Sequence, residues 1–150
     1  MSGPTHDRGL SAVARVRAVR ERDSRLGLRH AADEHQAREL KAAELDRLVR
    51  EHADAGTAAG QELPGWAAQR QALMALAAAA RKAHADAAAA ARLKAAAHEH
   101  WQRDRARLGA VEHLLGLRAD ERRAEVSRAV ARELDDIGGQ AWLRRREAAR

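Results

Sequence analysis

Histidines and adjacent carboxylates are the residues of this sequence whose types suit catalysis or metal binding. The chain has eight histidines, and His30 with Glu34, and the run His98-Glu99-His100, come nearest to metal-ligand spacing. Side chains two residues apart on a helix diverge by about 200°, so His98 and His100 point to different sides. His30 and Glu34 are two ligands at most, and the sequence has no His-Glu-x-x-His. We expect every histidine to be structural or exposed, and no metal site.

The sequence also lacks residue patterns typical of acid–base or nucleophilic catalysis. The adjacent carboxylates Asp33-Glu34, Asp120-Glu121 and Asp135-Asp136 are typical of solvated helix faces or of partners for arginines at i±4. A glycosidase-type pair of carboxylates needs a walled pocket, which two thin helices do not offer. The sequence contains no cysteine, no Gly-x-Ser-x-Gly and no P-loop. It therefore predicts a protein that is not an enzyme and that binds no cofactor.

The composition indicates long helices rather than a globular domain. Hydrophobic residues make up 45% of the 150 residues, but 39 of them are Ala, and Leu, Val and Ile together number only 24. Ala, Arg, Glu and Leu are strong helix formers, whereas a β-sandwich needs the β-branched and aromatic residues that are scarce here. The lack of cysteine suits a reducing compartment. No apolar run approaches the roughly 20 residues of a membrane span, and residues 1–7 lack the apolar stretch of a secretory signal.

Helix-breaking residues divide the chain into two long stretches. Residues 55–65 contain three glycines and Pro64, and a proline is well placed in the first turn of a new helix. Residues 8–54 and 66–137, on either side of this linker, contain no proline and only four glycines. We predict an all-α, elongated antiparallel two-helix coiled-coil hairpin, with Gly138-Gly139 ending the second helix. Its parts are a flexible N-terminus at 1–9, the hairpin at 10–137 with a linker at 55–65, and a short basic tail at 138–150.

The second stretch has the clearer heptad repeat. With Leu73 at position a, eleven of the fourteen a and d positions through Arg118 are apolar, which is typical of a coiled coil. The a positions are Leu73, Ala80, Ala87, Lys94, Trp101, Leu108 and Leu115, and the d positions are Leu76, Ala83, Ala90, Ala97, Asp104, Val111 and Arg118. Further on, the apolar stripe resumes in a shifted phase, which indicates a stutter, at Val126, Val130, Leu134 and Ile137.

The first stretch has a poorer pattern, because polar residues interrupt every candidate stripe. We expect it to be helical because its partner supplies the packing. Its larger apolar residues are Leu10, Val13, Val16, Val19, Leu26, Leu28, Leu40, Leu45, Leu48 and Val49. Residues 75–97 of the second stretch contain 15 alanines. Either these small side chains let two helices approach closely, or the segment is a low-complexity spacer without a partner.

The three tryptophans and the charge distribution leave alternatives open. Trp101 falls on the predicted seam and is expected in the core, whereas Trp66, near the predicted tip, suits either a staple against the other helix or a docking residue. The net charge is +6, with surpluses of +4 in residues 1–30 and +3 in residues 101–132. Such arginines attract phosphates, but acidic residues interleave with them and few aromatics are present. A basic nucleic-acid-binding coiled coil and a simple dimerisation rod are the alternative functions.

Four segments, taken in order, resemble those of one protein family. They are Leu10-x-x-Val13-x-x-Val16-Arg17-x-x-x-Glu21, Trp66 followed by Leu73-x-x-Leu76, the stretch from Trp101 to Leu114, and Arg132-Glu133-Leu134-Asp135-Asp136-Ile137 followed by Trp142-Leu143-Arg144-Arg145. Over residues 10–146 the sequence resembles the flagellar export protein FliJ family. The resemblance implies a cytoplasmic, non-enzymatic coiled-coil protein of flagellum biogenesis and motility, peripheral to the membrane at the flagellar base. The same coiled-coil structure would also suit an injectisome, in which related stalk proteins exist.

The resemblance also implies partners and contact residues. The family acts as a stalk whose paired terminal helices enter and stimulate the hexameric export ATPase FliI, and which couples that ATPase to the export gate FlhA. Escort of export chaperones is also attributed to the family, and neither nucleic acid nor a transmembrane segment is expected. Carried over, the ATPase-ring contacts are Arg17, Arg20, Glu21, Arg122, Val126, Val130, Leu134, Asp135 and Asp136. The gate contacts are Leu45, Val49, Leu73 and Leu76.

Overall fold

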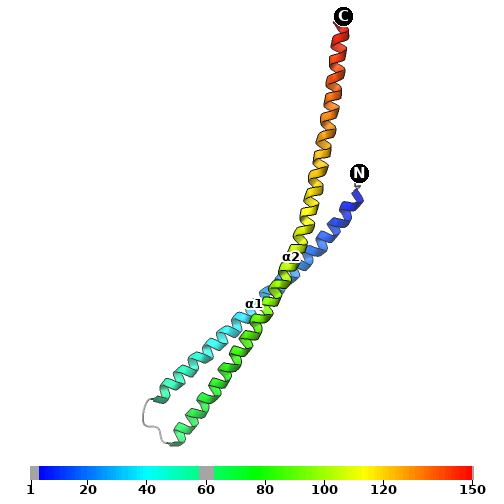
Figure 1. Ribbon diagram of the computed structural model, residues 1–150. Helices are drawn as coiled ribbons and strands as arrows, with labels where there is room; N and C mark the ends of the chain where they lie inside the picture. Colours follow the sequence, from blue (N-terminus) through cyan, green and yellow to red (C-terminus); the bar gives the residue numbers. More distant parts are fainter. Residues whose placement is uncertain (1–3, 58–62, 150) are drawn as a thin grey trace. The chain divides into compact units, whose positions relative to one another are not determined.

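A computed structural model, which describes residues 4–57 and 63–149, shows two long α-helices. Helix α1 spans Pro4–Thr57 and helix α2 spans Leu63–Ala148 (Figure 1). Each helix has a proline in its first turn, where the missing N–H leaves no hydrogen bond unmade. The prediction of an all-α two-helix hairpin is confirmed. α1 begins six residues before the predicted start at residue 10, and residues 58–62 of the predicted linker lie outside the described residues.

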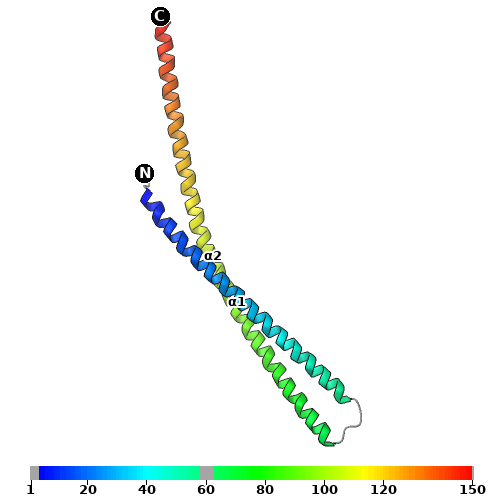
Figure 2. The same cartoon turned by 180° about the vertical axis from the view of Figure 1, so that it is seen from behind.

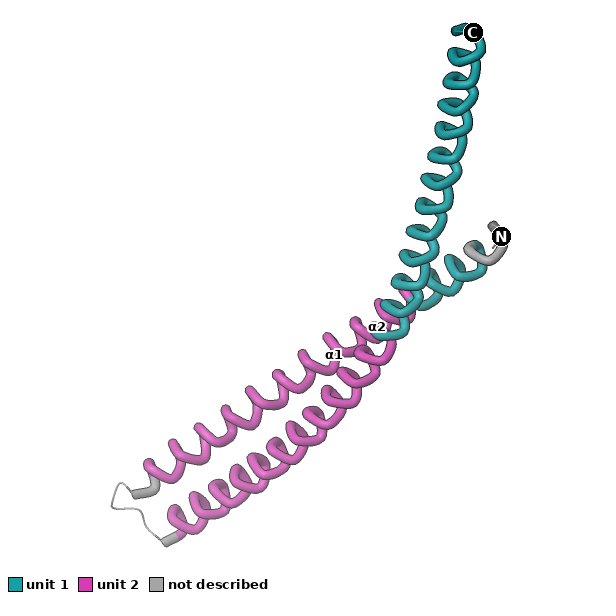
Figure 3. Tube along the Cα trace, turned by 45° about the horizontal axis from the view of Figure 1, so that its top comes forward, with its two compact units in different colours: residues 1–17, 106–150 teal, residues 18–105 magenta. Residues whose placement is uncertain are grey.

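The chain divides into two compact units, coloured separately in Figure 3. Unit 1 comprises residues 1–17 and 106–150, and unit 2 comprises residues 18–105. In unit 2, the two helices lie side by side and run antiparallel, as the opposed views of Figures 1 and 2 both show. In unit 1, the buried and most of the half-buried side chains come from residues 8–17 of α1 and 106–119 of α2.

The seam of α2 in unit 2 follows the predicted heptads. All of its buried side chains occupy predicted a or d positions, and Lys94 is the exposed exception among those positions. Small side chains at these positions let the two backbones approach closely, so the close-packing interpretation of the alanine-rich segment is confirmed and the spacer interpretation is wrong. The buried residues are Ala80, Ala83, Ala87, Ala90 and Asp104.

The seam of α1 in unit 2 uses a row of residues that the sequence pattern did not single out. It repeats every three and four residues from Glu21 to Val49 and includes polar side chains such as Ser24, His35 and Arg38, all buried or half-buried. Val19, Leu26 and Leu40 instead lie on the outer face and are exposed. The exposed face has at most one large apolar residue per heptad. The seam face carries, besides its polar residues, Leu28, Ala31, Ala42, Leu45 and Val49. The seam face therefore buries more apolar surface than the other face would.

The small size of the seam residues leads to a stability prediction. Ala90 is only 2% exposed, so a leucine there has no room and must push the helices apart or adopt a strained rotamer. We expect Ala90→Leu to lower the free energy of unfolding by about 1–3 kcal/mol, measured by urea denaturation followed by circular dichroism. Ala88→Leu, on the exposed face two residues away, should leave it nearly unchanged. Equal effects of the two variants would contradict a closely packed seam.

Helix α2 is much longer than α1, with 86 residues against 54. The difference of 32 residues corresponds to roughly 48 Å of helix without an α1 counterpart. We call residues 120–149 the α2 extension. Every described side chain in it is exposed except Ala141, which is half-buried. The prediction that Gly138-Gly139 ends the helix is wrong, because α2 continues through both glycines to Ala148.

The two glycines weaken the extension without breaking it. A Cβ placed on either Gly138 or Gly139 meets nothing within 4 Å, and an alanine loses less conformational entropy on folding than a glycine does. We expect the double variant Gly138→Ala/Gly139→Ala to stabilise the local helix by about 1–2 kcal/mol. Slower amide hydrogen exchange in residues 138–148 would show this, and unchanged exchange there would contradict it.

Within the described residues, neither helix contains a segment that is long and apolar enough to cross a membrane.

Candidate interaction surfaces

A polar layer of two side chains, the buried Glu21 and the half-buried Trp101, joins α1 and α2 at the end of unit 2 that lies away from the tip of the hairpin. The indole Nε1–H of Trp101 donates a hydrogen bond of 2.9 Å to Oε1 of Glu21, whose residue is only 7% exposed. Arg25 lies 3.9 Å from the other carboxylate oxygen, and the His98 ring contacts the indole at a centroid distance of 5.8 Å. A buried polar partner at an a position fixes the register of a coiled coil, so this layer aligns the two helices.

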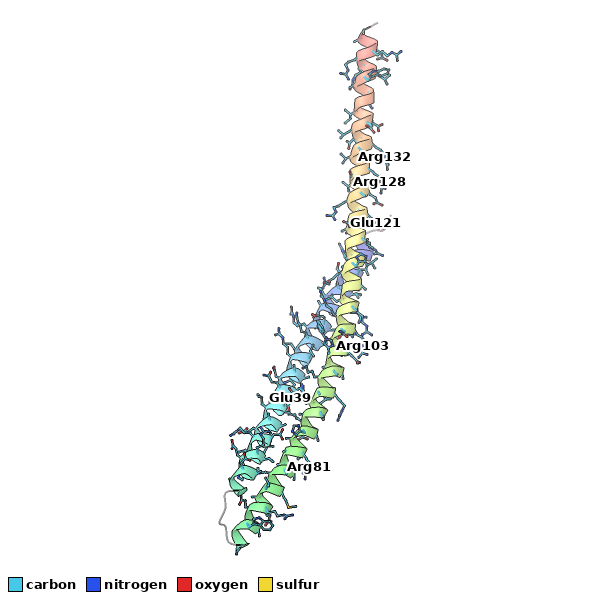
Figure 4. All side chains as sticks on the ribbon, turned by 60° about the vertical axis from the view of Figure 1, so that its left-hand side comes forward. Glu39, Arg81, Arg103, Glu121, Arg128 and Arg132 are labelled. Carbon is cyan, nitrogen blue, oxygen red and sulfur yellow. The ribbon has the colours of Figure 1, made fainter. Side chains whose placement is uncertain are left out.

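The α2 extension carries an apolar stripe that is exposed along its length. Val126, Val130 and Leu134 are 64%, 49% and 62% exposed, and Ile137 is similarly exposed. Their spacing of four, four and three residues keeps them on one face of the helix. Charged side chains, among them Arg128 and Arg132, lie about 160° away around the helix and project from it in Figure 4. The extension is therefore an amphipathic helix whose apolar face is exposed.

The predicted ATPase-ring residues fall into an exposed and a buried group. Arg20, Arg122, Asp135 and Asp136 are exposed, as are the valines and the leucine of the stripe. Arg17 is half-buried, and Glu21 is buried in the polar layer. Glu21 thus accepts a hydrogen bond from Trp101 within the hairpin. The sequence pattern did not predict this contact. All the exposed members of this predicted set except Arg20 lie on the extension.

The predicted gate residues are held between the helices near the tip. Leu45, Val49, Leu73 and Leu76 are all half-buried at seam positions of unit 2. The exposed apolar surface near the tip comes instead from Trp66 and Met74, and the Arg70 guanidinium lies 5.3 Å from the Trp66 ring centroid. Sequence reasoning noted Trp66 but missed Met74, although their i, i+8 spacing places both on one helix face.

Two of the histidines lie beside carboxylates near the middle of the hairpin. His84 Nε2 lies 2.9 Å from Asp46 Oδ2 across the two helices, and His35 Nε2 lies 3.4 Å from Glu39 Oε1. These side chains line a shallow groove of about 380 Å³ floored by alanines. In the part of the chain that the structure describes, no three ligand-type side chains gather closely enough to hold a metal ion.

One exposed carboxyl on the hairpin has a shifted pKa. A hydrogen bond of 2.7 Å from Lys82 to Asp86, with smaller contributions from Arg38 and Lys41, holds the pKa of Asp86 below its ordinary value. A group whose pKa is lowered by folding stabilises the fold above its unfolded pKa and ceases to do so as the pH falls through its folded pKa. Because the pair is exposed, its stabilising effect is small and screened by salt.

Comparisons with known proteins identify the family. A family model described as Flagellar FliJ protein matches residues 6–147, which is all but the first five and the last three residues. Searches of curated proteins and of solved structures returned no match. The match spans both helices and includes the polar layer, the tip of the hairpin and most of the extension. The chain therefore belongs to the flagellar FliJ protein family, whose members are structural components of the flagellar export machinery.

Proposed function

We propose that this protein is the stalk of the export ATPase complex, docking in the hexameric ATPase FliI, stimulating it and coupling it to the export gate FlhA. The observation that carries the proposal is the α2 extension, where a continuous apolar stripe remains exposed. A soluble protein rarely leaves such a stripe uncovered unless a partner covers it. Membership of the FliJ family supports a partner within the flagellar export machinery, and we infer that this partner is the export ATPase.

The charges of the extension suit a contact with a protein ring. Asp135 and Asp136 lie between the last two residues of the apolar stripe. Arg122 and Arg123 precede Val126, and they line a shallow depression together with Ala119 and Ser127. Both signs of charge are therefore present beside the apolar face. Charged groups at the edge of an interface steer association and fix its register, while the apolar residues supply most of the affinity.

The absence of cysteine allows a direct test of where the ring binds. A single cysteine in place of Val130 should form a cross-link to the purified ATPase hexamer through a short bifunctional reagent. A cysteine in place of Leu40, which is exposed on α1 of unit 2 to an even greater extent than Val130 is on α2, should not. Cross-linking from residue 40 alone, or from neither position when the two proteins are mixed at saturating concentration, would contradict docking through the extension.

We propose that the tip of the hairpin contacts the export gate. In this assignment Leu45, Val49, Leu73 and Leu76 act from within the seam by holding the tip together, and Trp66, Arg70 and Met74 provide the exposed contact. Half-exposed tryptophans are frequent hot spots of protein interfaces. We expect Trp66→Ala to weaken binding to the purified cytoplasmic domain of FlhA by about 10-fold or more, as measured by calorimetry.

The control for the tip contact is the tryptophan at the other end of α2. Trp142 is exposed to the same extent as Trp66 and also has an arginine over its ring. Trp142→Ala should leave gate binding unchanged. If the two variants bound the gate domain equally well, or if Trp142→Ala alone weakened binding, the assignment of the tip to the gate would be wrong.

A further inference from the structure

The last turns of α2 combine an exposed tryptophan with a run of arginines. Trp142 and Leu143 are each 53% exposed, and Arg144, Arg145 and Arg146 follow them directly. The guanidinium of Arg146 lies 5.1 Å from the centroid of the Trp142 ring. Helical geometry places Arg145 and Arg146 on either side of the indole, within about 60° of it. A large apolar ring is thus flanked by two cations on one helix face.

The surface beside this tryptophan is bare. A helical side chain covers the turn that precedes it, near positions i−3 and i−4, and at Trp142 those positions are Gly139 and Gly138. A Cβ placed on either glycine meets nothing within 4 Å. The indole therefore has no neighbouring side chain to pack on in that turn. Its apolar surface is available for burial against an apolar environment outside this chain.

The positive charge of the segment indicates which apolar environment suits it. Residues 138–149 contain three arginines and one glutamate, a net charge of +2. Tryptophan and arginine together favour the boundary of a bilayer, where the ring enters the headgroup region and the guanidinium groups bind lipid phosphates. A nucleic-acid duplex also offers phosphates, but it provides no apolar region for Leu143. The exposed Trp142-Leu143 pair therefore favours a lipid surface over nucleic acid.

We propose that residues 142–146 at the end of α2 bind the surface of a bilayer that contains anionic phospholipids. Trp142 and Leu143 enter the headgroup layer, and Arg144, Arg145 and Arg146 contact lipid phosphates. Each arginine near an anionic surface contributes a similar increment to binding. One short segment gives reversible attachment, comparable to that of a single lipid chain, so the contact tethers the protein at the membrane without anchoring it permanently. The proposal stands independently of the stalk function.

Vesicle binding of the full chain tests this contact. The probe is a vesicle of phosphatidylcholine with 30 mol% phosphatidylglycerol, and binding is followed by co-sedimentation and by the shift of tryptophan emission to shorter wavelength. We expect the variant Arg144→Gln/Arg145→Gln/Arg146→Gln to bind about 100-fold more weakly and Trp142→Ala about 10-fold more weakly. Binding should also weaken as sodium chloride is raised from 0.1 to 0.5 M.

The matched control is Trp66→Ala, because Trp66 has the same exposure and the same arginine contact at the tip. It should bind vesicles like the unmodified protein. The proposal is overturned if neutral and anionic vesicles bind equally, if Trp66→Ala weakens binding as much as Trp142→Ala, or if no binding occurs at millimolar lipid. Competition by millimolar inorganic phosphate would reassign the arginines to a free-phosphate site, and tighter binding to a DNA duplex than to vesicles would reassign them to nucleic acid.

Discussion

Replacing Trp101 with alanine is expected to lower the free energy of unfolding by about 3–4 kcal/mol. The change removes the largest side chain of the seam and leaves a cavity between the helices. It also removes the donor that hydrogen-bonds Glu21 at 2.9 Å, so that a carboxylate only 7% exposed loses its indole partner. The loss should appear as a lower urea midpoint in circular dichroism at 222 nm.

Two further variants separate packing from hydrogen bonding in this layer. Trp101→Phe keeps most of the ring but has no N–H, so we expect a smaller loss of about 1–2 kcal/mol. Trp66→Ala removes a tryptophan that is half exposed at the tip and should change the stability little. If Trp101→Ala proved no more destabilising than Trp66→Ala, the polar layer would not be what aligns the helices.

The double variant Leu134→Lys/Asp135→Lys is expected to weaken binding to the export ATPase by about 100-fold. It places a cation in the apolar stripe, where burial against a partner is costly, and reverses the charge of a flanking carboxylate. Leu134 is 62% exposed, and Asp135 is exposed as well, so the variant should unfold at the same urea concentration as the unmodified protein. Binding is measured by fluorescence anisotropy of labelled protein against ATPase hexamer.

The chain offers a closely matched control for this variant. Glu39 and Leu40 are likewise an adjacent acidic and apolar pair, and Leu40 is 65% exposed. The variant Glu39→Lys/Leu40→Lys makes the same change of charge and hydrophobicity on α1 of unit 2, and it should bind the ATPase normally. Equal weakening by both double variants would indicate a non-specific response to added positive charge, and the extension would lose its assigned role.

Much of α2 could be predicted because its heptad pattern is continuous. Apolar residues at most of the a and d positions fixed the seam from Leu73 onward, and every buried residue of α2 in unit 2, through Asp104, lies at a predicted a or d position. The pattern of α1 is weaker because its seam contains Glu21, Ser24, His35 and Arg38. Apolar periodicity alone does not single out a face when partner residues make polar side chains tolerable in a seam, as Trp101 does for Glu21.

The interaction surfaces were only partly predictable. The stripe from Val126 to Ile137 is visible in the sequence, but its exposure follows from the greater length of α2, because α1 supplies no residues to cover it. The prediction that Gly138-Gly139 ends the helix relied on local propensity. Each glycine weakens a helix by only about 1 kcal/mol, which is not enough to end α2 between good helix formers. The gate residues were carried over from the family resemblance, and all four are half-buried. The exposed apolar side chains near the tip are those of Trp66 and Met74.

The helices bury few large apolar side chains against each other. Among the residues that the structure describes, the buried apolar side chains are those of Leu108 and five alanines. Partners that cover the extension should therefore raise the apparent stability, by an amount that grows with their concentration.

Coupling of this protein to the export ATPase through the extension is tested most directly by titrating the protein into purified ATPase from the same organism and following phosphate release together with hexamer assembly. We expect turnover and assembly both to rise to a plateau. The rise should be lost with Leu134→Lys/Asp135→Lys but kept with Glu39→Lys/Leu40→Lys. No change in rate or assembly at saturating protein would contradict this coupling.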